Sequence, residues 1–274
     1  MNSTFIIQPT DIDTENASLY IEMKRQGLSY VIMEDGACAG LATFHFTTEL
    51  SDENTEKETH QLVMDHPVLL QAFKQVYIIY GYPQSVLVPH EFMTGTANEA
   101  MLELVFGDTK ETVMRTDYIE GHMIHNVYRV PAIIDAALTR YYEKAVFVHL
   151  FSILPKIIQD EASYLYCIFD TGQFIVLAQK AGKLQVVQHF SYKTADDVAY
   201  QMLNICKSFE LDVKETRVHL SGMIDAASPL YAEIFKYFLE LYFEPIPEQF
   251  TYPEDINNYP VHYFSHLFAV TACV

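Results

Sequence analysis

Apolar and polar residues follow the same order of predicted elements in two successive stretches of the chain. In the first, three short segments rich in β-branched and aromatic residues are separated by Gly27 and Gly36. In the second, three similar segments are separated by Gly172 and Gly182. After each set the pattern changes to helix, buried strand and helix. Both stretches therefore predict the order strand-strand-strand-helix-strand-helix.

The predicted elements are short and are bounded by glycine, proline or charged residues. Strands are expected at 18–24, 28–34, 39–46, 75–81, 123–130, 144–151, 162–170, 173–180, 183–192 and 216–222. Helices are expected at 59–73 (interrupted by Pro67), 91–107, 131–143, 153–162, 194–209, 229–241 and 262–274. The charge run 49–58 is expected to be a solvated loop that leads into a helix.

The spacing of three glycine pairs suggests that the two stretches are copies of one unit. Gly172 follows Gly27 by 145 positions, Gly182 follows Gly36 by 146, and Gly222 follows Gly81 by 141. Near-constant offsets are typical of a duplication, although three matches in two β-rich halves can also arise by coincidence. We expect two α/β lobes, residues 1–160 and 161–274, with a cleft between them.

The formal charge of −19 limits the classes of partner. Nucleic acid and anionic membrane surfaces repel a strongly acidic protein, so neither is expected as a partner. A basic protein partner is compatible with this charge, and a local basic site could still bind a phosphate.

The cysteines and the apolar runs predict a cytoplasmic protein without membrane insertion. Cys38, Cys167, Cys206 and Cys273 are far apart and form no Cys-x-x-Cys pair, which favours buried thiols in a reducing compartment. The N-terminal residues resemble no signal peptide. The apolar run 145–154 is too short to span a bilayer.

The segment Phe169-Asp170-Thr171-Gly172-Gln173-Phe174 is the strongest chemical motif, and it has three interpretations. Asp-Thr-Gly could be half of an aspartic-protease site, but that site needs two such turns that share one proton. A second copy would have to come from a homodimer. The motif could instead be a phosphate-binding turn, or an ordinary hairpin that uses Asp and Gly for their turn preferences.

With its duplicated βββαβα unit the sequence resembles the actin-like ATPase superfamily, whose two lobes are ribonuclease H-like. It also resembles a bacterial family of unknown function assigned to that fold, through the segment 86–89 ("VLVP") and the aromatic C-terminal segment ending "CV". The resemblance implies an α/β fold of two related lobes.

The resemblance also implies a site in which two Asp-x-Gly turns hold Mg-ATP. It places the second phosphate turn at Asp170, Thr171, Gly172 and Gln173, and the first at Arg25, Gln26 and Gly27, followed by Leu28. The adenosine motif would be Ser221 and Gly222. Arg25 then replaces an aspartate, and Met223 replaces a second glycine, so the usual magnesium site is broken.

These substitutions favour a non-catalytic interaction scaffold with a protein partner, and leave a Mg-ATP binder or slow ATPase as the alternative. Arg25 could contact a phosphate directly or pair with Asp170. Whether the protein is an enzyme or a homodimer stays open. No catalytic residue or metal ligand is assigned, because His262 and His266, four positions apart, lack a third ligand and fit an amphipathic final helix.

Overall fold

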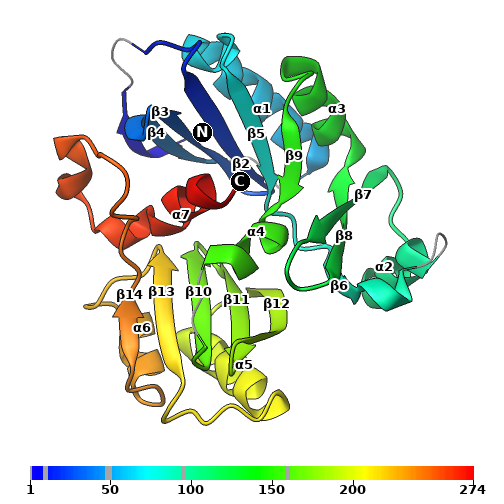
Figure 1. Cartoon of the computed structure of the whole chain (residues 1–274), viewed down its shortest axis with the longest axis vertical. Coiled ribbons are helices and arrows are strands. Elements are labelled where there is room, and N and C mark those ends of the chain that lie inside the picture. The colour runs from blue at the N-terminus through cyan, green and yellow to red at the C-terminus, as the bar shows by residue number, and fades with distance from the viewer. Residues whose placement is uncertain (1, 9–11, 47–50, 94–96, 158–160) are drawn as a thin grey trace. The chain divides into compact units, whose positions relative to one another are not determined.

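The computed structural model describes residues 2–8, 12–46, 51–93, 97–157 and 161–274, and its contacts divide the chain into two compact units. Unit 1 comprises Met1–Ile153, Glu248–Ile256 and Val274. Unit 2 comprises Leu154–Pro247 and Asn257–Cys273. Figure 1 labels the helices and strands of both units.

In the described residues of unit 1, the main sheet has six strands in the order β1-β4-β3-β2-β5-β9. Strands β2, β3 and β4 form an antiparallel meander, β1 pairs antiparallel with β4, and β5 and β9 add parallel strands beyond β2. The bounds are β1 (Asn2–Ile7), β2 (Ala17–Lys24), β3 (Gly27–Glu34), β4 (Ala37–His45), β5 (Gln75–Tyr80) and β9 (Val146–His149).

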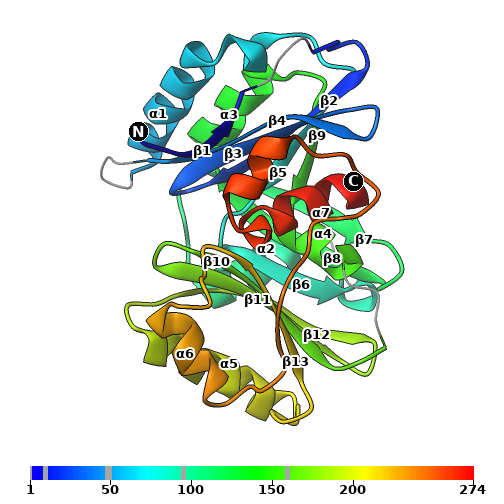
Figure 2. The ribbon, with the colours of Figure 1, turned by 90° about the vertical axis from the view of Figure 1, so that its left-hand side faces the viewer.

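Helices α1 (Asp52–Asp65) and α3 (Ala132–Tyr141) cover one face of this sheet (Figure 2). Alternate β2 residues, among them Leu19, Ile21 and Met23, have no exposed surface and share a core with Leu62 of α1 and Leu138 of α3. Because side chains alternate between the faces of a strand, this period-2 burial fixes which face of β2 meets the helices.

A smaller sheet in unit 1 has the order β6-β8-β7 and packs beside α2 (Ala97–Phe106). Its bounds are β6 (Ser85–Pro89), β7 (Thr112–Ile119) and β8 (Ile124–Pro131), and Val88, Leu102 and Val127 form its core. The remaining short elements of this part are η1 (Pro67–Leu70), η2 (His90–Phe92) and α4 (Leu150–Ile157), whose last residues belong to unit 2.

Unit 2 has one described sheet, of order β12-β11-β10-β13-β14, which matches β4-β3-β2-β5-β9 in strand order and direction. Its bounds are β10 (Tyr164–Asp170), β11 (Gln173–Lys180), β12 (Lys183–Ser191), β13 (Arg217–Gly222) and β14 (Leu241–Phe243). Three antiparallel strands followed by two parallel ones are the ribonuclease H-like order, so the predicted fold class is confirmed.

Helices α5 (Ala195–Ser208) and α6 (Pro229–Phe235) lie on one face of this sheet (Figure 2). At the start of α5, the Thr194 side chain accepts from Asp197 N–H and the Asp197 side chain accepts in return, which forms a capping box. The apolar stripe of α5, including Val198 and Met202, packs with Ile234 of α6 and the strands. The chain ends with η3 (Glu254–Asn258), η4 (Val261–Tyr263) and α7 (Ser265–Cys273).

Several elements differ from the sequence prediction. Strands β1, β6, β7 and β14 were not predicted, and the helix predicted at 229–241 ends at Phe235. Helix α1 begins within the charge run because Ser51 caps it by accepting from Asn54 N–H. The predicted strand 144–151 is shorter, because α4 begins at Leu150. The final helix was predicted to be amphipathic, which is wrong, since every residue from Ser265 to Thr271 is buried. Parts of predictions that fall on 49–50, 94–96 and 158–160 lie outside the described residues.

No helix in the described ranges has both the length and the apolar character needed to cross a bilayer.

Gly222 and Gly182 give a matched test of the packing at the end of β13. Both have positive φ, +79° and +74° respectively. A Cβ on Gly222 would lie 2.2 Å from the Phe169 carbonyl oxygen, whereas one on Gly182 would have its nearest neighbour at 3.6 Å. Gly182→Ala should cost about 1 kcal/mol through backbone strain. Gly222→Ala should cost more than about 3 kcal/mol, measured by urea denaturation. Equal losses of stability in the two variants would show that the close approach of Gly222 to Phe169 adds nothing to the cost of a side chain.

Candidate functional site

The register of the first hairpin places Lys24, not Arg25, at the position that corresponds to Asp170. In unit 1, Lys24 pairs with Gly27 across a two-residue turn, Arg25-Gln26. In unit 2, Asp170 pairs with Gln173 across the turn Thr171-Gly172. Asp170 lies 146 positions after Lys24.

The second hairpin of each unit supports this register. Glu34 pairs with Ala37 in unit 1, and Lys180 pairs with Lys183 in unit 2. Lys180 again lies 146 positions after Glu34. The sequence alignment that matched Gly27 with Gly172 was therefore wrong by one residue. The constant offset is what a duplication would produce, and the duplication itself stays a prediction.

Lys24 forms an ion pair on its own strand. Its Nζ lies 3.0 Å from Glu22 Oε2, and the two side chains are 16% and 4% exposed. Residues two apart on a strand point to the same face, which brings the two groups together. The aliphatic part of Lys24 crosses Gly81, where an added Cβ would lie 2.9 Å from Lys24 Cγ. The position in unit 1 that corresponds to Asp170 therefore holds a lysine whose stem packs against Gly81 and whose ammonium group is paired with Glu22.

The turn at Asp170 is held by hydrogen bonds within unit 2. Asp170 Oδ1 accepts from Thr171 N–H at 2.7 Å, and the Asp170 carbonyl accepts from the Tyr192 hydroxyl at 3.1 Å. Gln173 Oε1 lies 2.9 Å from His189 Nε2. Gly172 has φ +69°, a conformation that glycine adopts without strain. These contacts are those of a well-formed hairpin, and Thr171 and Gly172 are exposed at its tip.

Ser221 and Gly222 are the last two residues of β13. The residue of unit 1 that corresponds to Gly222 also differs from the one expected from the sequence. Gly222 pairs with Phe169, whereas Tyr80 pairs with Met23, so Tyr80 rather than Gly81 corresponds to Gly222. The close approach of Gly222 to Phe169 leaves no space for a side chain and explains the glycine without a ligand.

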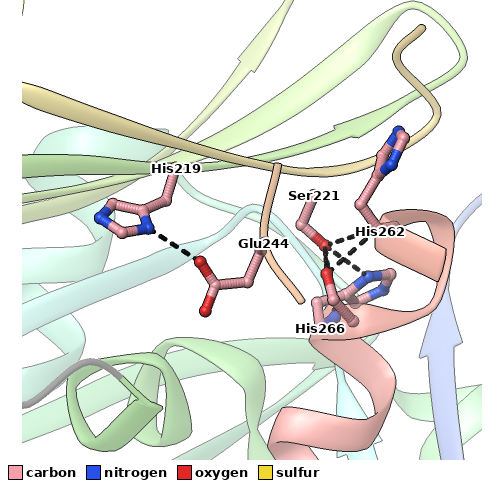
Figure 3. Close-up of polar contacts among 6 residues, drawn as sticks. His219, Ser221, Glu244, His262 and His266 are labelled. Atoms are coloured by element: carbon pink, nitrogen blue, oxygen red, sulfur yellow. Dashed lines mark hydrogen bonds and ion pairs between the residues drawn. The ribbon is translucent and has the colours of Figure 1, made fainter. Parts of the chain in front are cut away.

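Ser221 is fully buried and anchors the segment that leads into α7 (Figure 3). Its hydroxyl donates to the His262 carbonyl oxygen at 3.2 Å, lies 2.7 Å from Ser265 Oγ, and accepts from His266 N–H at 3.2 Å. The hydroxyl is therefore occupied by the protein's own groups. These contacts give Ser221 a structural role.

His262 and His266 also make internal contacts. His262 belongs to η4 rather than the final helix, and its Nε2 lies 2.6 Å from the Ile224 carbonyl oxygen. His266 Nδ1 lies 3.3 Å from Ser221 Oγ. Burial lowers the pKa of His262. Over the described residues, no group of three or more His, Cys, Asp or Glu side chains is arranged to hold a metal ion.

A buried polar network in unit 1 was not anticipated from the sequence. Asp117 Oδ2 accepts from Ser152 Oγ at 2.6 Å and from His149 N–H at 2.8 Å, and Oδ1 accepts from the Tyr128 hydroxyl at 3.2 Å. Burial, only partly offset by these bonds, raises the pKa of Asp117. These residues come from separate strands and α4, so no local motif could have revealed them.

Arg25 lines a cavity of about 190 Å³ within unit 1. The other lining residues that carry charge or a hydroxyl are Asp52, Tyr82, Thr109, Lys110, Thr112 and Arg129. Of these, only Arg25 was a candidate from the sequence. The structure thus places it with cationic and hydroxyl groups of its own unit.

Comparisons with solved structures show the actin-like ATPase fold. A Bacteroides thetaiotaomicron protein described as having an actin-like ATPase fold and unknown function matches at 15% identity, with a TM-score of 0.78 over 96% of this chain and 99% of that one. A structure of the PilM-PilN type IV pilus biogenesis complex matches at 11% identity, with a TM-score of 0.60 over 93% and 96%.

The ethanolamine utilization protein EutJ from Carboxydothermus hydrogenoformans matches at 7% identity, with a TM-score of 0.51 over 98% of this chain and 93% of that one. No curated protein sequence matches the chain. The model of the family described as "Protein of unknown function (DUF3822)" matches residues 8–241. The predicted resemblance to the actin-like ATPase superfamily is confirmed, and the chain belongs to the DUF3822 family.

Proposed function

We propose that this chain is a non-catalytic interaction protein on an actin-like ATPase fold. The observation that carries the proposal is Lys24 at the position corresponding to Asp170, ion-paired with the buried Glu22. A magnesium site built from one carboxylate on each turn needs an acid at both positions. An ammonium at one of them repels the metal, and its pairing within β2 makes it part of the fold.

Exposed apolar side chains support a protein partner. Phe92, Leu104, Val105, Tyr118 and Met123 are each at least half exposed, and all lie in the segment 90–123, on η2, α2, β7 or the turn after β7. Leu104 is 87% exposed. Large apolar side chains that are exposed to solvent are candidates for contact with a partner protein. A structural neighbour described as the PilM-PilN type IV pilus biogenesis complex supports the proposal of a protein partner.

The cysteines support a cytoplasmic location. Cys38, Cys167 and Cys206 are buried free thiols. Burial raises the pKa of Cys38 to about 12 and that of Cys206 to about 11, so both stay protonated and unreactive at neutral pH. Free thiols of this kind are typical of proteins in a reducing compartment.

The alternative, a Mg-ATP binder or slow ATPase, is favoured by the turn at Asp170. Its carboxylate lies next to the exposed residues Thr171 and Gly172, and the positive φ of Gly172 permits the tight turn whose backbone N–H groups can face a phosphate.

Removing Lys24 should test whether its ion pair is structural. Lys24→Met takes the ammonium away from the buried Glu22 carboxylate and should lower the free energy of unfolding by roughly 3 kcal/mol. The double variant Glu22→Gln/Lys24→Met removes both charges and should recover most of that loss. Circular dichroism during urea denaturation measures both. If the double variant is as unstable as Lys24→Met, the ion pair is not what Lys24 contributes.

Nucleotide binding should separate the proposal from its alternative. We expect no magnesium-dependent thermal shift with millimolar ATP or ADP, and no phosphate release above that of a heat-inactivated control. A bound nucleotide at a hundredfold excess over Kd would stabilise the fold by about 2.7 kcal/mol. Magnesium-dependent turnover, or a magnesium-dependent shift that Asp170→Asn abolishes, would show that the alternative is correct.

Photo-crosslinking should locate the partner surface. A photoreactive phenylalanine analogue at Leu104, in cells that express the native protein, should give a discrete crosslinked product. The same analogue at Tyr200, which is 66% exposed on α5, is the matched control and should not give that product. Identical products from both positions, or none from Leu104, would contradict a partner surface on the segment 90–123.

A further inference from the structure

The cavity of about 190 Å³ in unit 1 joins four loops or element ends that are distant in sequence. It lies among the β2–β3 turn, the first residue of α1, the loop after β5, and the open end of the β7–β8 hairpin, where the start of β7 pairs with the end of β8. The complete lining is Arg25, Asp52, Tyr82, Pro83, Gln84, Thr109, Lys110, Thr112, Arg129 and Pro131. Every one of these residues belongs to unit 1, so the cavity is a feature of that unit alone.

The lining is cationic in a protein with a net charge of −19. Arg25, Lys110 and Arg129 contribute three positive charges, and Asp52 contributes one negative charge. The net charge of the lining residues is therefore +2. Charges of this sign gathered in a concave site attract and retain anions, because the surrounding protein screens them less than water does.

Arg129 is rigidly held at the cavity. It is 6% exposed, and its Nη1 donates to the Gly107 carbonyl oxygen at 2.9 Å and to Thr109 Oγ1 at 2.6 Å. Both described side-chain bonds leave from Nη1, so Nη2 and Nε keep donors for a ligand. A guanidinium whose orientation is already fixed loses little entropy when it binds an oxyanion.

Tyr82 supplies a buried donor that the protein itself does not use. It is 4% exposed, and within the described part of the chain its hydroxyl has no hydrogen-bond partner. Leaving such a group unsatisfied costs about 1–3 kcal/mol. Burial raises the pKa of Tyr82, and the nearby Asp52 adds to that effect while Arg25 opposes it, so the hydroxyl keeps its proton at neutral pH.

The backbone at Tyr82 is fixed by His149. The His149 Nε2 lies 2.9 Å from the Tyr82 carbonyl oxygen, and its Nδ1 accepts from Phe151 N–H at 3.1 Å. With Nδ1 as an acceptor, Nε2 carries the proton and donates to Tyr82. Burial lowers the pKa of His149 to about 4, so this neutral arrangement persists at physiological pH.

We propose that this cavity binds the phosphate group of a small molecule, with Arg25, Lys110 and Arg129 as charge partners and the Tyr82 hydroxyl as a donor. A phosphate monoester carries a charge of about −1.5 to −2 at pH 7, which matches the net charge of +2 of the lining residues. Its three terminal oxygens can accept hydrogen bonds from several guanidinium and hydroxyl donors at once. A carboxylate carries half the charge and fewer acceptor positions. The site needs neither Asp170 nor a metal ion.

Titration of the intact protein with inorganic phosphate tests the proposal. Calorimetry in chloride buffer without magnesium or nucleotide, with acetate at matched ionic strength as the reference anion, should show saturable phosphate binding that acetate does not reproduce. Because neither magnesium nor Asp170 is involved, the result does not depend on whether the protein is an ATPase. Absence of saturable phosphate binding, or equal binding of acetate, would overturn the proposal.

Three variants with one control assign the site. Arg25→Gln and Lys110→Gln change exposed residues and should each weaken phosphate binding about tenfold. Tyr82→Phe removes one hydroxyl and should weaken binding roughly fivefold. Because that hydroxyl has no partner in the ligand-free fold, Tyr82→Phe should not lower the melting temperature.

Lys144→Gln is the control, because Lys144 is exposed in unit 1 but does not line the cavity. It should leave the phosphate affinity unchanged. An equal loss in Lys144→Gln and Lys110→Gln would indicate a general charge effect. Full affinity in Arg25→Gln, Lys110→Gln and Tyr82→Phe would place the bound phosphate elsewhere. Either outcome would overturn the proposal.

Discussion

The pairing of β2 with β3 and β5, and of β10 with β11 and β13, fixes the positions of the candidate residues in the first hairpin of each unit and at the end of β13. Slipping a strand by one residue moves all its side chains to the opposite face. The burial of Leu19, Ile21 and Met23 against the helices therefore sets the register of β2. The same register directs Glu22 and Lys24 to the other face and makes them an ion pair. This register is what places Lys24 at the position that corresponds to Asp170.

Gly27 and Gly172 look equivalent in the sequence, yet they are glycines for different physical reasons. Gly172 lies inside its turn and has φ +69°. Gly27 is the first residue of β3 and has no positive φ. A Cβ there would lie 2.2 Å from the Phe44 carbonyl oxygen. A hairpin can need glycine either for its dihedral angles or for the close approach of a neighbouring strand. The sequence shows the glycine but not which of these constraints applies, which is why the alignment was one residue off.

The cavity in unit 1 shows how a strongly acidic chain can still offer a basic site. Its cations come from a hairpin turn, from the loop before β7 and from β8, and Tyr82 comes from the loop after β5. Each of these three segments contributes a single cation to the lining. The site arises because β6, β7 and β8 are inserted between β5 and α3, which brings their ends beside the first hairpin of the main sheet.

The sequence by itself determined the fold class, the two sets of three strands, the helix at 194–209 and the motif at Asp170, because these depend on local periodicity and turn chemistry. Strands β6 and β7, the burial of α7 on all sides and the partners of Ser221 were decided only by the tertiary structure. So were the match of Lys24 with Asp170 and the gathering of Arg25, Tyr82, Lys110 and Arg129 around one cavity. Each of these depends on strand register or on contacts between segments far apart in the chain, and neither leaves a periodic signal in the sequence.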